Sequence, residues 1–178
     1  MNKSLVLYKV KDRIAHITLN RPEKLNAFNQ EMSYALRDTW HRFENDPKAQ
    51  VAILTGQGKS FSVGVDLTDQ DRITGKPWQY HEAYPLNGIS LFKPVVAAVR
   101  GYALGQGYII SVTGCDITIA ADSAIFGYPE GKAGVSQIPP QYVPYMPFKI
   151  ALEFMLLSWK GGRMMNAQRA YEVGLVNK

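Results

Sequence analysis

The chain has 178 residues, 46% of them hydrophobic and 20% charged, a composition that fits one globular domain and excludes a disordered or fibrous chain. The formal net charge is +5, and no basic run or basic–aromatic repeat indicates nucleic-acid binding. The single cysteine, Cys115, excludes an internal disulfide, the first residues are too charged for a signal peptide, and no apolar run suits a membrane span, so we expect a cytoplasmic protein.

The first part of the chain predicts a β-hairpin, a helix and a buried strand. Residues 4–10 and 14–19 are rich in β-forming residues and are separated by three polar ones, which is typical of two hairpin strands. From 29 to 43, apolar residues recur every three or four positions, which predicts a helix with Asn29 as its N-cap. Residues 51–55 are a short apolar run typical of a buried strand.

The second part alternates short strands with helices. Residues 67–92 are polar and lack a clear period, which predicts a long loop. Residues 94–99 and 115–121 are predicted strands, and 150–159 and 166–174 are predicted helices. Helices placed between short buried strands indicate a single domain of the α/β or α+β class.

Two glycine-rich turns follow two of the predicted buried strands. They are "GQGKSFSVGVD", residues 56–66, and "RGYALGQGYII", residues 100–110, and each is expected to lead into a short helix. Glycine permits positive φ, and a helix start offers unpaired N–H groups. One N–H from each turn can therefore converge on a single oxygen as an oxyanion hole. A single glycine turn would equally suit close packing of a strand on a helix, and two matched turns make that explanation weaker. The spacing of Gly101, Gly105 and Gly107 does not fit the phosphate-binding motifs.

Other reactive residues carry no motif of their own. Cys115 has no catalytic signature around it, and His16, His41 and His81 lack the spacing of metal ligands. We therefore expect no metal and no separate cofactor.

Four segments in chain order resemble the signatures of the enoyl-CoA hydratase/isomerase (crotonase) superfamily. They are "ITLNRPEKLNAFN", "VAILTGQGKSFSVGVDL", "KPVVAAVRGYALGQG" and "CDITIAADSAIFGYPEGKAGV". The resemblance implies an α/β fold with a ββα spiral core, formed as one domain by residues 1–178. It also implies an acyl-CoA thioester substrate, with CoA present only as part of that substrate, and a homotrimer or a hexamer built from two trimers.

The resemblance also assigns roles to residues. The backbone N–H groups of Val65 and Gln106 would hold the thioester oxygen, and Glu130, in "GYPEG", would be the catalytic acid or base. A carboxyl group with a raised pKa beside an apolar acyl pocket suits proton transfer at a carbon atom. The positions expected to bind the CoA portion are Lys24, Leu25, Ala27, Val63, Gly64, Asp66, Leu67 and Gly105.

A second glutamate expected from the family pattern is absent. Its position falls on Ile109, or on Ile110 when aligned from the other side, because one extra residue separates "GYALGQG" from "CD". One carboxylate suffices for double-bond isomerisation, whereas hydration in the two-glutamate members uses both. His81 and Glu82, in the long loop, are possible substitutes. The resemblance therefore leaves open whether the enoyl-CoA is hydrated or isomerised.

Two further departures from the family pattern affect the substrate and the assembly. Residues 136–148, "SQIPPQYVPYMPF", replace a glycine-rich segment and alter the expected acyl pocket. The chain is also expected to lack a C-terminal helical segment that covers the site and supports the trimer. These departures support an alternative, in which the protein is a non-catalytic acyl-CoA-binding or truncated member of the family.

Overall fold

The computed structural model describes residues 4–69, 90–130, 145–158 and 164–178. Their main feature is a five-stranded sheet with the order β1-β2-β3-β4-β6. Strands β1 and β2 form the predicted antiparallel hairpin, and every other pairing in this sheet is parallel. The strands are β1 (Val6–Lys11), β2 (Ile14–Leu19), β3 (Val51–Gly56), β4 (Val95–Val99) and β6 (Ile117–Ala120).

A second, three-stranded sheet with the order β5-β7-β8 was not predicted from the sequence. Its strands are only two or three residues long: β5 (Tyr102–Leu104), β7 (Ile125–Gly127) and β8 (Met165–Asn166). Such short runs carry no periodicity of their own, because a pattern of alternation needs at least four residues to be visible. This small sheet joins the second glycine turn to the C-terminal helices.

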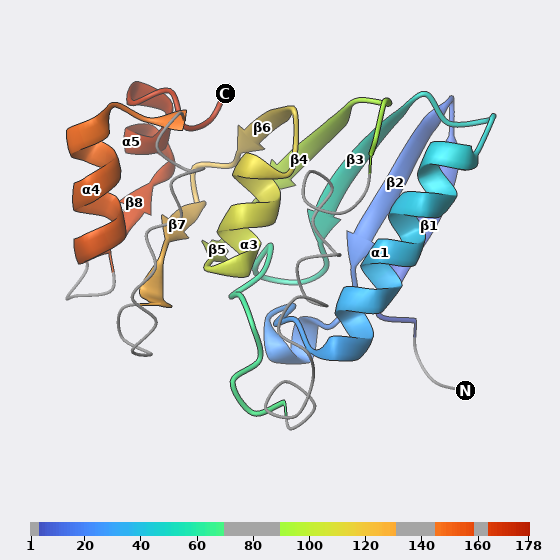
Figure 1. Ribbon diagram of the computed structural model, residues 1–178, viewed down its shortest axis with the longest axis horizontal. Helices are drawn as coiled ribbons and strands as arrows, with labels where there is room; N and C mark the ends of the chain where they lie inside the picture. Colours follow the sequence, from blue (N-terminus) through green and yellow to red (C-terminus); the bar gives the residue numbers. More distant parts are fainter. Residues whose placement is uncertain (1–3, 70–89, 131–144, 159–163) are drawn as a thin grey trace.

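The predicted helices form close to their expected bounds. Helix α1 (Gln30–Asn45) begins at Asn29, whose side chain accepts a hydrogen bond from the Met32 N–H at 3.0 Å. Helices α4 (Phe148–Leu157) and α5 (Ala167–Glu172) lie at the other end of the molecule, beside β7 and β8 (Figure 1). Gly174, just after α5, has φ of +78°, as expected for a residue that ends a helix.

The core lies between α1 and one face of the large sheet. Figure 1 shows α1 and α3 (Gln106–Tyr108) on the same face of that sheet. The helix contributes a buried stripe at the predicted spacing, and the sheet contributes alternate residues that point toward it. These fully buried side chains are Met32, Leu36, Trp40 and Phe43 from α1, and Ile17, Leu19 and Leu54 from the sheet.

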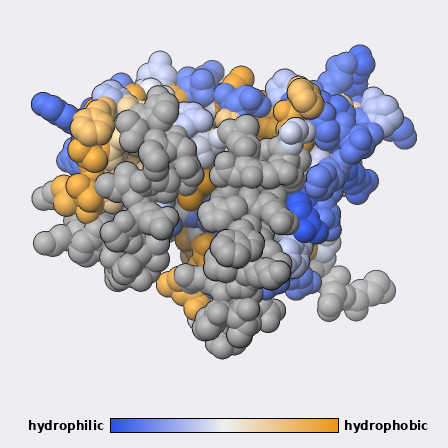
Figure 2. Space-filling view, in the orientation of Figure 1, coloured by the Kyte–Doolittle hydropathy of each residue, from blue (hydrophilic) through white to orange (hydrophobic). Residues whose placement is uncertain are grey.

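Surface character differs between the two ends of the molecule. Figure 2 shows hydrophilic side chains over α1 and β1, and apolar side chains over α4. On α4, Phe148 is 61% exposed and Leu156 is 53% exposed. No helix among the described residues has the length and apolar character needed to cross a bilayer.

Candidate active site

The two glycine turns pack directly against each other, backbone to backbone. Ser62 and Ala103 form a parallel bridge, in which the Ser62 N–H donates to Tyr102 O at 3.0 Å and the Leu104 N–H donates to Ser62 O at 2.9 Å. A Cβ atom on Gly107 would lie 2.5 Å from Ser62 O, so only glycine fits there. The glycines therefore allow the two turns to pack closely, in addition to any role of the turns in catalysis.

The N–H groups of Val65 and Gln106 lie where these turns meet. A Cβ atom on Gly64 would be 3.4 Å from the Gln106 nitrogen, so the residue before Val65 lies against that amide. Phe28 forms two hydrogen bonds with the first turn, each 2.8 Å long: its N–H donates to Gly64 O, and its carbonyl accepts the Asp66 N–H. Neither bond involves the N–H of Val65, which lies between Gly64 and Asp66 in the chain. Within the described residues, neither the Val65 nor the Gln106 N–H donates a backbone hydrogen bond, as the prediction that both hold a ligand oxygen requires.

A helix begins directly after the second turn, whereas only residues 67–69 are described after the first. Helix α3 begins at Gln106, with Gly105 as its N-cap at φ 51° and ψ −118°. After the first turn, the Asp66 carboxylate accepts hydrogen bonds from the Thr68 N–H and hydroxyl, at 3.0 and 2.7 Å. An aspartate that accepts such bonds is typical of a helix N-cap, and the residues from 70 onward, where the expected helix would continue, lie outside the described residues.

Glu130 lies just after β7 and reaches back to the second glycine turn. Its Oε1 atom rests against Gly105, so that a Cβ atom there would overlap it. Its Oε2 atom is buried and has no hydrogen-bond partner in the described part of the chain. Burial raises the pKa of Glu130 to about 7, so near neutral pH the carboxyl group exchanges a proton readily. One acid–base group therefore lies beside one of the two predicted oxyanion donors.

The position of the absent glutamate is apolar and buried in the structure. Ile109 is 8% exposed and Ile110 is 0% exposed. Both lie in a π-helical turn, Ile109–Thr113, closed by a bond from the Gly114 N–H to Ile109 O at 3.0 Å. A π turn holds one residue more than an α turn, which agrees with the extra residue that the family resemblance implies between "GYALGQG" and "CD".

Side chains around the π turn donate hydrogen bonds to its carbonyl groups. The Thr113 hydroxyl donates to Ile109 O at 2.7 Å, the Cys115 thiol to Ile110 O at 3.2 Å and the Thr118 hydroxyl to Ser111 O at 2.6 Å. Burial raises the pKa of the Cys115 thiol, so this residue supports the turn and is a poor nucleophile. Asp116 is also structural, because its Oδ2 atom accepts the Val95 N–H at 2.7 Å.

Several positions expected to bind CoA lie in the loop before α1 and beside the first turn. The loop passes through Leu25 and Asn26 with φ of 50° and 56°, an uncommon backbone held by Asn26, whose side chain donates to Gln57 O and Ser60 O. Lys24 is exposed, Leu25 is 38% exposed and Leu67 is 66% exposed, whereas Ala27 is buried. The Val63 N–H donates to Leu25 O at 3.2 Å, so loop and turn form one continuous surface.

Asp66 serves the structure of this surface. Arg21 Nη1 lies 2.7 Å from Asp66 Oδ2, and both side chains are largely buried. The hydrogen bond from Thr68, followed by that from Arg21, lowers the pKa of Asp66 to about 2. Sequence reasoning missed Arg21, Thr68 and Ser62, because their contacts join residues far apart in the chain or depend on turn geometry.

The remaining candidates divide between described and undescribed residues. His81 and Glu82, suggested as substitutes for the absent glutamate, lie outside the described residues. So does most of the proline-rich segment 136–148. Across 4–69, 90–130, 145–158 and 164–178, no group of three or more His, Cys, Asp or Glu side chains is arranged to hold a metal ion.

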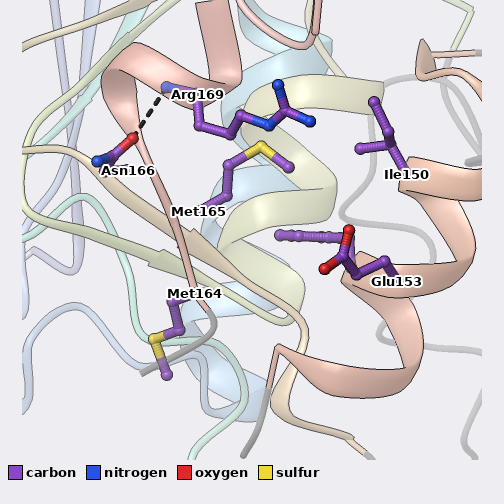
Figure 3. Close-up of a pocket in the computed structure, with 7 residues that line it drawn as sticks. Ile150, Glu153, Met164, Met165, Asn166 and Arg169 are labelled. Atoms are coloured by element: carbon purple, nitrogen blue, oxygen red, sulfur yellow. Dashed lines mark hydrogen bonds between the residues drawn. The ribbon is translucent and has the colours of Figure 1, made fainter. Parts of the chain in front are cut away.

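A separate cavity of about 200 Å³ lies between α4, β8 and α5. Figure 3 shows its apolar lining, which includes Ile150, Met164 and Met165, together with the charged residues Glu153 and Arg169. It shares no residue with the predicted site. The two are connected through Gly127, because Met164 packs against this glycine, whose carbonyl accepts the Gly105 N–H at 3.0 Å.

Sequence comparison identifies the family. The profile of the family described as enoyl-CoA hydratase/isomerase matches residues 9–178, and this chain belongs to that family. It is 34% identical to an (E)-benzylidenesuccinyl-CoA hydratase from Thauera aromatica, over 97% of this chain and 68% of that protein. It is 34% identical to a mevalonyl-coenzyme A hydratase from Aspergillus fumigatus, over 91% of this chain and 61% of that protein.

Solved structures confirm the fold expected from the resemblance. An enoyl-CoA hydratase/isomerase from Mycobacterium paratuberculosis superposes with a TM-score of 0.81 at 34% identity, covering 97% of this chain and 67% of that one. An enoyl-CoA hydratase/carnitine racemase from Magnetospirillum magneticum has a TM-score of 0.84 at 28% identity, covering 99% and 68%. The α/β crotonase fold is therefore correct, and the chain spans roughly two thirds of the length of these relatives.

Proposed function

We propose that this protein acts on an acyl-CoA thioester, stabilising its enolate while one carboxyl group moves a proton. The Val65 and Gln106 N–H groups hold the thioester oxygen, and Glu130 transfers the proton. The relatives named above support an enoyl-CoA hydratase or isomerase activity. The observation that carries the proposal is the contact of the Glu130 carboxylate with Gly105, the residue before the Gln106 donor.

The chemistry follows from where charge develops. Removal of a proton from the carbon next to a thioester, or addition of a nucleophile to the conjugated double bond, places negative charge on the thioester oxygen. Two fixed N–H donors stabilise that charge, each contributing about 2.7–4 kcal/mol in comparable sites. A carboxyl group with a pKa of about 7 accepts and returns a proton near neutral pH.

The CoA portion is expected to lie along the loop before α1 and the first glycine turn. Leu25 and Leu67 present apolar surface, and the nearby Lys24 ammonium group offers a charge to the CoA phosphates. Ala27, Val63, Gly64, Asp66 and Gly105 shape this surface mainly through their backbone, because Asp66 is committed to Arg21 and Thr68. These assignments follow the family pattern, and the exposure of the two leucines supports them.

The test compares two substrates in heavy water. A 2-enoyl-CoA and a 3-enoyl-CoA are incubated with the protein, and the products are followed by NMR. We expect deuterium at the carbon next to the thioester, with either a 3-hydroxyacyl product or a shifted double bond. Unchanged substrates without deuterium would contradict an enzymatic function.

The apolar residues Ile109 and Ile110, which stand at the position of the absent glutamate, favour a second candidate function: acyl-CoA binding without catalysis. It predicts that acyl-CoA binds, as measured by calorimetry, and that no deuterium enters the bound thioester. The same heavy-water experiment therefore separates the two candidates.

For cellular context, we propose that residues 1–178 form one crotonase-like core domain, in the cytoplasm, and that copies associate as a trimer or hexamer. Exposed apolar residues, such as Ile117 and Ile119 at 42% each, support association. Light scattering coupled to size-exclusion chromatography tests the assembly, and a monomer at micromolar concentration would contradict it.

A further inference from the structure

Within the described residues, Gln106 and Glu130 carry buried polar atoms that have no hydrogen-bond partner. In the described residues, both amide atoms of Gln106 and the Oε2 atom of Glu130 are buried and make no hydrogen bond. Gln106 is 1% exposed, so solvent does not compensate its amide. Gly105 links the two residues, because it precedes Gln106 in the chain and lies against the Glu130 carboxylate.

An amide buried in this way is costly to the folded protein. A buried donor or acceptor without a partner destabilises the folded state, because it has lost its hydrogen bonds to water and gained none in the protein. Most buried polar groups are therefore paired. Such exceptions are expected where a ligand supplies the partner. The glutamine amide offers an acceptor oxygen and an NH₂ donor and stays neutral, so it suits a group that both donates and accepts, such as water or a hydroxyl.

We propose that the Gln106 side chain holds the water that adds to the double bond, in place of the absent glutamate. This inference rests on the proposed function and deepens it, because it assigns the chemistry to hydration over isomerisation. The Gln106 oxygen accepts one O–H of the water, and the Glu130 carboxylate takes its other proton. The water oxygen bonds to C3, the double-bond electrons move onto the thioester as an enolate, and Glu130 returns the proton to C2.

Gln106 then acts twice, with its backbone N–H on the thioester oxygen and its side chain on the water. The two roles are separable, because a substitution changes the side chain and keeps the N–H. Ile109 and Ile110 supply no polar atom from their side chains, whereas the Gln106 amide lies one helical turn before these positions in the sequence. Hydration depends on the amide, whereas proton exchange at C2 of a saturated thioester needs no added water.

The experiment measures the ratio of these two reactions in Gln106→Met and Gln106→Glu. Hydration is followed with crotonyl-CoA, and deuterium exchange at C2 with butyryl-CoA in heavy water. We expect the ratio of hydration to exchange to fall about tenfold or more in Gln106→Met, which loses both polar atoms. Gln106→Glu keeps an acceptor oxygen and is expected to recover most of the ratio. Gln168→Met, at an exposed position on α5, is the matched control and should keep the wild-type ratio.

A thermal melt separates this role from a structural one. Because methionine relieves an unpaired buried amide, we expect the melting temperature of Gln106→Met to rise by about 2–4 °C. A ratio in Gln106→Met within twofold of the wild type overturns the inference, as does an equal loss of both reactions with a lower melting temperature. Glu130→Gln distinguishes that failure from failure of the proposed function, because it should abolish both reactions whatever Gln106 does.

Discussion

Arg21 Nη1 donates to Asp66 Oδ2 at 2.7 Å and to the Ala27 carbonyl at 3.0 Å, so one guanidinium group joins the loop before α1 to the end of the first glycine turn. Val65 lies directly before Asp66, and the position of its N–H therefore depends on this contact. Arginine suits the role because its planar group presents several donors in fixed directions, which lysine cannot do.

Removal of Arg21 should destabilise the fold and weaken catalysis. We expect Arg21→Ala to lower the free energy of unfolding by about 3–5 kcal/mol, because it leaves the largely buried Asp66 carboxylate without its charged partner. Arg21→Lys should lose less stability. Urea denaturation measures both. The control is Arg169→Ala, which removes an exposed ion pair with Glu172 and should change stability by less than about 1 kcal/mol. Equal losses in Arg21→Ala and the control would contradict the account.

Gly105 should tolerate no side chain. In Gly105→Ala, the new methyl group overlaps the Glu130 carboxylate, and φ of 51° is strained for alanine. We expect turnover to fall on the order of 10²-fold, as when an oxyanion donor is lost. Gly174→Ala is the matched control, because Gly174 has φ of +78° with nothing within 4 Å of a new Cβ. It should lose stability from backbone strain and keep its activity. Full activity in Gly105→Ala would show that Glu130 does not act from its present position.

Activity should rise with pH as Glu130 ionises. With burial raising the pKa of Glu130 to about 7, the proton-accepting form is scarce below that pH and dominant above it. The same raised pKa has an opposite effect on stability. Between the ordinary pKa of 4.5 and about 7, the unfolded chain releases a proton that the folded chain keeps, so the folded state loses stability as pH rises through this window.

The check is a pH profile of turnover together with urea midpoints at several pH values. Glu130→Gln should remove this contribution to the pH dependence of stability. Below the pKa of Glu130, the activity is expected to fall about tenfold for each pH unit. A wild-type activity that stays constant between pH 5 and 9 would therefore contradict catalysis by a titrating carboxylate.

The π turn should depend on the hydroxyl groups around it. Thr118→Val keeps the shape of a buried side chain and removes the 2.6 Å bond to Ser111 O. We expect a loss of about 1–3 kcal/mol, the cost of leaving a buried carbonyl unpaired. Thr55→Val removes a longer bond, 3.2 Å to Ala98 O, at a half-buried position and should cost less. Thermal denaturation compares the two, and a larger loss in Thr55→Val would contradict this account of the π turn.

Periodicity predicted the elements that are long enough to show it. The hairpin, α1 with its Asn29 cap and strand β6 follow from residue patterns along the chain, and strands β3 and β4 follow from short apolar runs. Strands β5, β7 and β8 were not predicted, because a run of two or three residues is too short to show a period. The π turn also escaped prediction, because the extra residue between "GYALGQG" and "CD" does not by itself indicate whether it lies in a helix or in a loop.

The sequence named residues of the proposed site but not their surroundings. Glycine turns and the family pattern pointed to Val65, Gln106 and Glu130, but the buried, unpaired state of the Gln106 amide is visible only in three dimensions. The pairing of Arg21 with Asp66 spans 45 positions in the chain. Neither residue alone indicates its partner, because an ordinary charged side chain is most often exposed.

The measurement that tests the central claim most directly is deuterium exchange at C2 of butyryl-CoA, by wild-type protein and by Glu130→Gln. An exchange that is rapid in the wild type and lost in Glu130→Gln, with butyryl-CoA still bound as measured by calorimetry, is the predicted result. It would mean that Glu130 moves the proton while backbone N–H groups hold the enolate. Equal exchange in both proteins would contradict the account and require another base.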